Sequence, residues 1–186
     1  MNPSTKDLLD AIETVTSDRV VVLPNNKNVI LAAEQASSLS SKSVAVIPTR
    51  SIPQGISALL ALNHQADLED NVGLMTAALD EVESGEITTA TRSVTVNDVE
   101  VTAGQIIGLH DGELKVSGTT IEGVAQKLLK EMDPTDREII TLYYGDNVSG
   151  SDASTLADLL QQDWPDLEIE VINGGQSHYH YILSLE

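Results

Sequence analysis

The chain of 186 residues carries 29 acidic and 10 basic side chains, a formal net charge of -19 at pH 7, and it contains neither cysteine nor phenylalanine. This charge repels nucleic acid and anionic lipid, and no cluster of Lys or Arg offsets it, so we expect no nucleic acid partner and no integral membrane contact. The lack of cysteine excludes a disulfide scaffold and a cysteine nucleophile, while a hydrophobic content of 41% indicates a globular protein, which we expect in the cytoplasm.

The first sixty or so residues alternate between helices and short apolar strands. A helix is predicted to start at Ser4, which can cap it, and strands are predicted at residues 20–23 and 44–47. Each strand leads through a polar loop into a helix, and Ser51 is the expected cap of the second of these helices. Continuous apolar strands that alternate with helices are typical of a parallel sheet covered on both faces.

The pattern changes after residue 66. Apolar residues at intervals of three and four predict a helix over 67–84, which ends near Ser84 and Gly85. The following Thr- and Val-rich segment, 86–118, alternates as an antiparallel meander does, with tight turns expected at Asn97–Asp98 and Asp111–Gly112.

A capping box of Thr119 and Glu122 then predicts a helix with a clean apolar stripe. A strand, a helix and two further strands follow, the last of them over residues 178–186. We therefore predict an α/β fold of two small subdomains: 1–66 mostly parallel, 67–84 a connecting helix, and 85–186 mixed.

Two polar loops follow the predicted parallel strands, at the edge where open α/β sheets bind ligands. Each loop leads into a helix, whose free N–H groups and dipole favour an anion or an acidic group of a partner. Taken singly, these residues are explained as helix caps, but one Lys and one Arg in adjacent loops favour a binding role. Neither loop has the glycines of a nucleotide-binding motif. We call the set the polar rim: Asn25, Asn26, Lys27, Asn28, Thr49, Arg50, Ser51, Gln54 and Gly55.

The C-terminal stretch GGQSHYHYILSLE allows three interpretations: a metal site, an anion-binding turn, or the entry of a last strand into a sheet. His178 and His180 are expected on one face of that strand and could share a metal, but a site needs a third ligand, and the sequence does not mark one. No nucleophile elbow is present either. We therefore assign no catalytic residue and no metal ligand.

Collinear stretches over nearly the whole chain resemble the C-terminal region of the bacterial fatty acid kinase large subunit, a DhaL-domain-containing, dihydroxyacetone kinase-like family. The most specific are VVVLPNNKNVILAAEQA and SVAVIPTRSIPQGISALLALN, and the others are MNPSTKDLLDAIE, GQIIGLHDGELKVSG and the C-terminal stretch. In that stretch the matching positions are Gly174, Gly175, Gln176, Tyr179 and Tyr181, whereas other residues are usual in place of the two histidines. The histidines are therefore interpreted as incidental, and the glycines and tyrosines as a structural turn and strand.

The resemblance implies a modular kinase. An N-terminal domain would bind ATP and Mg²⁺, a middle domain would supply Cys and His, and the C-terminal region would dock a fatty-acid-carrying, DegV-like small subunit. Nothing in this chain matches the first two domains, so alone it is expected to be no enzyme and to hold no cofactor. The resemblance also implies a degenerate DegV-like fold without the lipid-binding serine motif, with Met1 as an internal residue and the first subdomain truncated.

Three hypotheses follow. The first is a non-catalytic docking module that binds the small subunit through the polar rim. The second is an α/β domain that itself binds a small anion such as a fatty acid or an acyl phosphate. The third is a region that forms a homodimer of the kinase.

Overall fold

The computed structural model describes residues 2–96 and 99–186, so the turn expected at Asn97 and Asp98 lies outside the described residues. The chain divides into two compact units, one up to Val82 and the other from Glu83 to Glu186. Across the described part of the chain, no helix is both long and apolar enough to cross a membrane.

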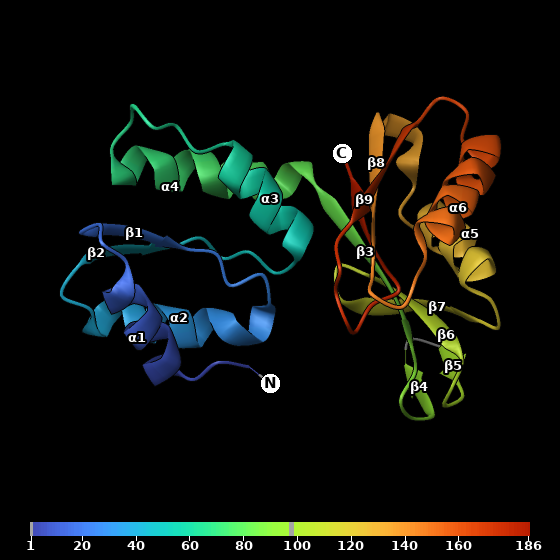
Figure 1. Ribbon diagram of the computed structural model, residues 1–186, viewed down its shortest axis with the longest axis horizontal. Helices are drawn as coiled ribbons and strands as arrows, with labels where there is room; N and C mark the ends of the chain where they lie inside the picture. Colours follow the sequence, from blue (N-terminus) through green and yellow to red (C-terminus); the bar gives the residue numbers. More distant parts are fainter. Residues whose placement is uncertain (1, 97–98) are drawn as a thin grey trace. The chain divides into compact units, whose positions relative to one another are not determined.

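The first unit is a two-stranded parallel sheet between two pairs of helices, as predicted. Its elements are α1 (Thr5–Thr14), β1 (Arg19–Val22), α2 (Lys27–Leu39), β2 (Ser43–Val46), α3 (Ile52–Leu60), α4 (Leu68–Ala77) and the 3-10 helix η1 (Ala78–Glu81). In Figure 1, α1 and α2 lie on one face of the sheet, and α3 and α4 lie on the other. Val20 accordingly packs against Ile12 and Ala36 of the first pair, whereas its neighbour Val21 packs against the cluster that contains Met75 of α4.

Helix caps explain most of the boundaries in this unit. Ser4 and Asp7 form a capping box at α1, and Ser51 caps α3, as predicted. The helix expected over 67–84 is shorter, because α4 ends at Ala77 and η1 follows it. Since α4 packs against α3 and β2, it belongs to the first unit.

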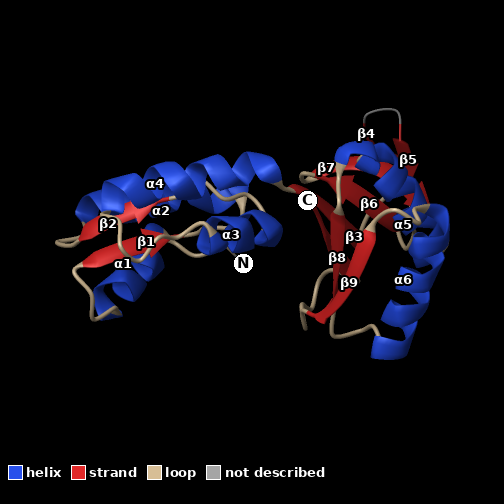
Figure 2. Cartoon of the chain, turned by 90° about the horizontal axis from the view of Figure 1, so that it is seen from above, coloured by secondary structure: helices blue, strands red, loops and turns tan. Residues whose placement is uncertain are grey.

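The second unit is a six-stranded mixed sheet. Its elements are β3 (Glu83–Thr89), β4 (Val94–Val96), β5 (Val99–Val101), β6 (Ile106–His110), β7 (Glu113–Gly118), α5 (Ile121–Glu131), the 3-10 helix η2 (Pro134–Asp136), β8 (Ile139–Tyr144), α6 (Gly150–Asp163), β9 (Glu168–Asn173) and β10 (Tyr181–Leu185). The strand order is β7-β6-β3-β10-β8-β9, and β4 pairs separately with β5. Figure 2 shows α5 and α6 on one face of the six-stranded sheet, where they help to bury an extensive apolar cluster.

The antiparallel pairing of β3, β6 and β7 confirms the predicted meander. Its tight turn at Asp111 and Gly112 is also confirmed, since both residues have positive φ, at 49° and 75°. Strands β8 and β9, joined through α6, are parallel. The unit is therefore mixed, as expected.

The helix end predicted at Ser84 and Gly85 is wrong, because both residues lie inside β3. Gly85 faces α5 instead: a Cβ added there would lie 3.0 Å from the Met132 sulfur and 3.2 Å from a Leu128 side-chain carbon. The glycine thus allows a helix to approach the sheet closely, a tertiary role that a local pattern does not reveal.

Two other boundaries also differ from the prediction. Thr120, not Thr119, caps α5, because its side chain accepts a hydrogen bond from the Gly123 N–H. The last strand begins at Tyr181, so Tyr179 is not part of it, and His178 and His180 precede it instead of sharing one of its faces.

Candidate functional site

The two loops of the polar rim lie side by side. Strands β1 and β2 are parallel and in register, with Val22 opposite Val46, so their carboxyl ends open at the same edge. The Thr49 hydroxyl then accepts a hydrogen bond from the Asn25 backbone N–H at 2.9 Å, which ties one loop to the other. The structure therefore brings together the residues that the sequence placed in two separate loops.

Asn25 is the most constrained residue of the rim. Its φ of 52° is in the left-handed region, which asparagine tolerates better than most residues. Its side chain lies over Gly55 of α3, where an added Cβ would lie only 2.2 Å from Asn25 Oδ1. The same oxygen is buried and has no hydrogen-bond partner among the described residues. Gly55 therefore leaves the space that Asn25 occupies.

Side-chain caps fix the starts of α2 and α3, where the two loops end. Asn26 accepts a hydrogen bond from the Asn28 N–H at 2.9 Å, and Ser51 accepts one from the Gln54 N–H at 3.3 Å. Gln54 also fixes the loop before α3, because its Oε1 accepts a hydrogen bond from the Arg50 N–H at 2.8 Å. The free N–H groups of two helix ends thus lie beside a preorganised loop pair.

The rim residues differ in solvent exposure, so some of them support the loops and others form the surface of the rim. Thr49, Ser51 and Gly55 are buried: the Thr49 and Ser51 hydroxyls hold the loops, and Gly55 leaves room for the Asn25 side chain. Lys27, Asn28 and Arg50 are exposed, and Asn25, Asn26 and Gln54 are half-buried.

The two cations of the rim have no partner within the described part of the chain. Neither the Lys27 ammonium nor the Arg50 guanidinium forms a hydrogen bond or ion pair with any other described residue. On a chain with a net charge of -19, the exposed part of the rim is a cationic spot that can attract a carboxylate, a phosphate or an acidic protein surface.

The C-terminal turn packs against the end of β8. Gly174 and Gly175 donate their N–H groups to the Tyr144 carbonyl at 3.0 and 3.2 Å. Gly175 has a φ of 63°, which glycine adopts without strain. The Gln176 Nε2 then donates to the Tyr143 carbonyl at 2.7 Å. These residues form the structural turn that the sequence indicates.

His180 is held by two partners that the sequence did not indicate. Its Nε2 lies 2.8 Å from the Thr89 Oγ1, and its Nδ1 lies 2.7 Å from the Asn147 Nδ2. Asn147 lies in the loop after β8. Its position as a polar residue after a strand was the only feature of the sequence that could have indicated a role for it. Within the described ranges, no group of three or more His, Asp or Glu side chains could hold a metal ion.

Tyr181 gives the second unit a pH dependence. Burial, with smaller contributions from the Asp152 and Glu122 carboxylates, raises the pKa of the Tyr181 phenol to about 12 from its usual 10.0. Because the folded pKa is the higher one, the stability it contributes is fully present below the unfolded value, near pH 10, and is lost as the pH rises through about 12.

We therefore expect the urea midpoint of the second unit to fall as the pH rises over this window, and to fall less steeply in Tyr181→Phe. Burial also raises the pKa of Tyr143 and Tyr179, so the variant reduces the slope without abolishing it. Fluorescence of Trp164, the only tryptophan and a member of the second unit, measures the midpoint. Equal slopes in both proteins would exclude Tyr181 as a cause.

Sequence comparison relates the whole chain to one family. The FakA-like family model, which describes the C-terminal part of the A-type subunit of fatty acid kinase, matches residues 1–186. Protein YloV of Bacillus subtilis is 39% identical over 186 residues, which are 100% of this chain and 34% of YloV. The chain therefore spans about a third of the length of this curated relative.

Solved structures share the fold. The fatty acid kinase (Fak) B3 protein of Streptococcus pneumoniae, loaded with linoleic acid, superimposes with a TM-score of 0.69 at 12% identity, over 99% of this chain and 76% of that one. DegV, a fatty acid binding protein from Bacillus subtilis, gives a TM-score of 0.63 at 13% identity, over 99% and 77%. Likeness at this identity shows the fold alone, and it confirms the DegV-like α/β architecture. The family model matches the chain over its full length. The chain therefore belongs to the family of FakA-like C-terminal regions of fatty acid kinase proteins.

Proposed function

We propose that this chain is the non-catalytic docking module of a fatty acid kinase large subunit. It binds the DegV-like small subunit that carries the fatty acid, so that the acyl carboxylate can be phosphorylated in a separate kinase domain. ATP and Mg²⁺ belong to that other domain, and the chain itself holds no cofactor. The family match and the relative YloV support a place in a fatty acid kinase.

The contact surface we propose is the exposed part of the polar rim. The observation that carries this choice is the pair of cations, Lys27 and Arg50, that have no described partner on a strongly acidic chain. Electrostatic complementarity of this kind increases the association rate and fixes the orientation of a partner. The rigid support beneath the cations reduces the entropy that ordering the loops would cost on binding.

Arg50→Ala is expected to weaken binding of the small subunit about tenfold or more, the scale of an interface hot spot. Its thermal midpoint should stay unchanged, because the Arg50 side chain is exposed and contacts no described acceptor. Titration calorimetry with the purified DegV-like protein measures both affinity and stoichiometry.

The matched control is Arg92→Ala, which removes an exposed arginine of the second unit. An equal loss of affinity in both variants would mean that the net charge of the chain, and not the position of Arg50, causes the effect. Asn26→Ser offers a second probe of the rim, because serine keeps the helix cap and only the amide is lost. Failure of the well-folded, unmodified chain to bind would refute the docking proposal.

A second candidate function rests on the same rim: capture of a small anion such as a fatty acid carboxylate or an acyl phosphate. The free helix N–H groups beside Arg50 favour it. A ligand that binds only the folded chain raises its unfolding temperature by mass action. A shift with acyl phosphate analogues, without any binding of the small subunit, would select this function over docking.

A further inference from the structure

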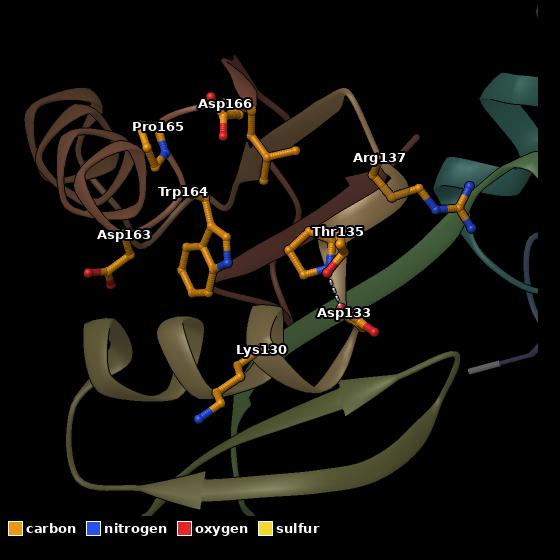
Figure 3. Close-up of a pocket in the computed structure, with 10 residues that line it drawn as sticks. Lys130, Asp133, Thr135, Arg137, Asp163, Trp164, Pro165 and Asp166 are labelled. Carbon is orange, nitrogen blue, oxygen red and sulfur yellow. Dashed lines mark hydrogen bonds between the residues drawn. The ribbon is translucent and has the colours of Figure 1, made fainter.

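A hollow of about 330 Å³ lies in the second unit, and none of the residues that line it belongs to the polar rim. One wall follows α5 and η2, and the other follows the C-terminal end of α6 (Figure 3). Its volume is that of a small binding site. Trp164, the only tryptophan of the chain, stands between the two walls.

Both walls are fixed by hydrogen bonds. The Gln161 amide donates to the carbonyls of Trp164 and Leu167 at 3.2 and 2.9 Å, which holds the loop after α6. On the opposite wall, the Thr135 hydroxyl donates to Asp133 at 2.6 Å, next to a proline. The hollow is therefore formed before any ligand arrives.

The lining combines apolar walls with a polar group that is still available. Pro134, Pro165 and the half-buried indole of Trp164 provide the apolar surface. No described residue accepts a hydrogen bond from the indole N–H, which Figure 3 shows on the side of the ring toward Thr135. A planar cation would meet the face of this ring, because a guanidinium only donates and cannot accept a hydrogen bond from the indole N–H.

The charges at the hollow favour a cation. Three carboxylates line it, those of Asp133, Asp163 and Asp166. Helices α5 and α6 also end there, at Glu131 and Asp163, and a helix C-terminus carries partial negative charge.

The two cations among the lining residues are turned elsewhere. Figure 3 shows the Lys130 ammonium pointing away from the indole. The Arg137 guanidinium donates to Glu83 at 2.7 Å. Lys130 forms no ion pair with a described carboxylate, and the Arg137 guanidinium is paired with Glu83.

We propose that this hollow receives an arginine side chain of a partner protein, with the guanidinium against the Trp164 indole and the carboxylates around it. A planar guanidinium matches both the ring face and the carboxylates, whereas a lysine ammonium is a compact, strongly hydrated charge. The chain thus has a second interaction surface, on the second unit and independent of the docking proposed for the rim.

The fluorescence of Trp164 can report binding in the hollow, because the chain contains no other tryptophan. The probe is N-acetyl-L-arginine amide, and its control is the neutral isostere N-acetyl-L-citrulline amide. We expect a saturable change in Trp164 fluorescence with the arginine probe, a response weakened by salt, and no saturable change with the citrulline one. An equal response to both probes, or no saturable response to arginine, would overturn the proposal.

The double variant Asp163→Asn and Asp166→Asn is expected to weaken binding of the arginine probe about fivefold or more, since it removes two charges beside the site. Asp158→Asn, an exposed position on the same helix, is the matched control and should bind as the unmodified chain does. Because Asp163 accepts a hydrogen bond from Gln126, Asp166→Asn alone repeats the test without disturbing that bond. Unchanged affinity in these carboxylate variants, or an equal loss in the control, would contradict the assignment.

Discussion

Replacing Leu183 with alanine is expected to lower the free energy of unfolding of the second unit by about 2–5 kcal/mol. Leu183 is fully buried at the centre of β10, where it pairs with Gly85 of β3 on one side and Leu142 of β8 on the other. Both neighbouring strands are fixed in register, so the space left by the missing side chain cannot close easily. The loss of stability therefore has two parts: the transfer free energy of the buried side chain and the cost of the cavity that it leaves.

Urea denaturation followed by Trp164 fluorescence measures this loss, because the only tryptophan lies in the second unit. The control is Ile172→Ala on the edge strand β9, where the side chain is 41% exposed. We expect the control to lose about 1 kcal/mol or less. If Leu183→Ala were as stable as Ile172→Ala, the assignment of β10 to the core would be wrong.

The sequence predicts most of the fold where local chemistry decides it. The caps at Ser4 and Ser51 and the turn at Asp111 depend on hydrogen bonds and dihedral preferences within a few residues. The helix predicted over 67–84 is too long, because Ser84 and Gly85 match a helix end in the sequence. Only the packing of α5 against β3 explains the glycine, and that contact joins distant segments.

The position of the rim was also predictable from the sequence. Which of its residues are buried and which are exposed was not predictable. Topology places the loops after β1 and β2 at one edge, and the structure confirms that they meet. Which residues become support depends on tertiary contacts, such as that between Asn25 and Gly55. The hollow beside Trp164 had no signal in the sequence, because its walls come from separate segments after α5 and α6.

The C-terminal turn leads to the other prediction with a large effect, Gly145→Ala. A Cβ at Gly145 would lie 2.2 Å from the Tyr179 carbonyl oxygen and 2.6 Å from the Gln176 carbonyl oxygen, both of them backbone atoms. No side-chain rotation can relieve such contacts, so the segment 174–180 has to move away from the end of β8. The hydrogen bond from the Gly145 N–H to the His180 carbonyl, at 2.9 Å, would be strained or lost with it.

We expect Gly145→Ala to destabilise the second unit by about 3 kcal/mol, in the upper range for added volume at a closely packed site. Gly150→Ala is the matched control five positions away, since an added Cβ there would meet its nearest atom, the Tyr144 hydroxyl oxygen, at 3.4 Å. Because Gly150 begins α6 and its φ is not positive, alanine there should leave stability unchanged or raise it by about 0.4–1 kcal/mol. Urea denaturation followed by Trp164 fluorescence compares the two variants. Equal stability would mean that the C-terminal turn does not pack on β8; a loss confined to Gly145→Ala makes that contact the reason for a glycine at this position.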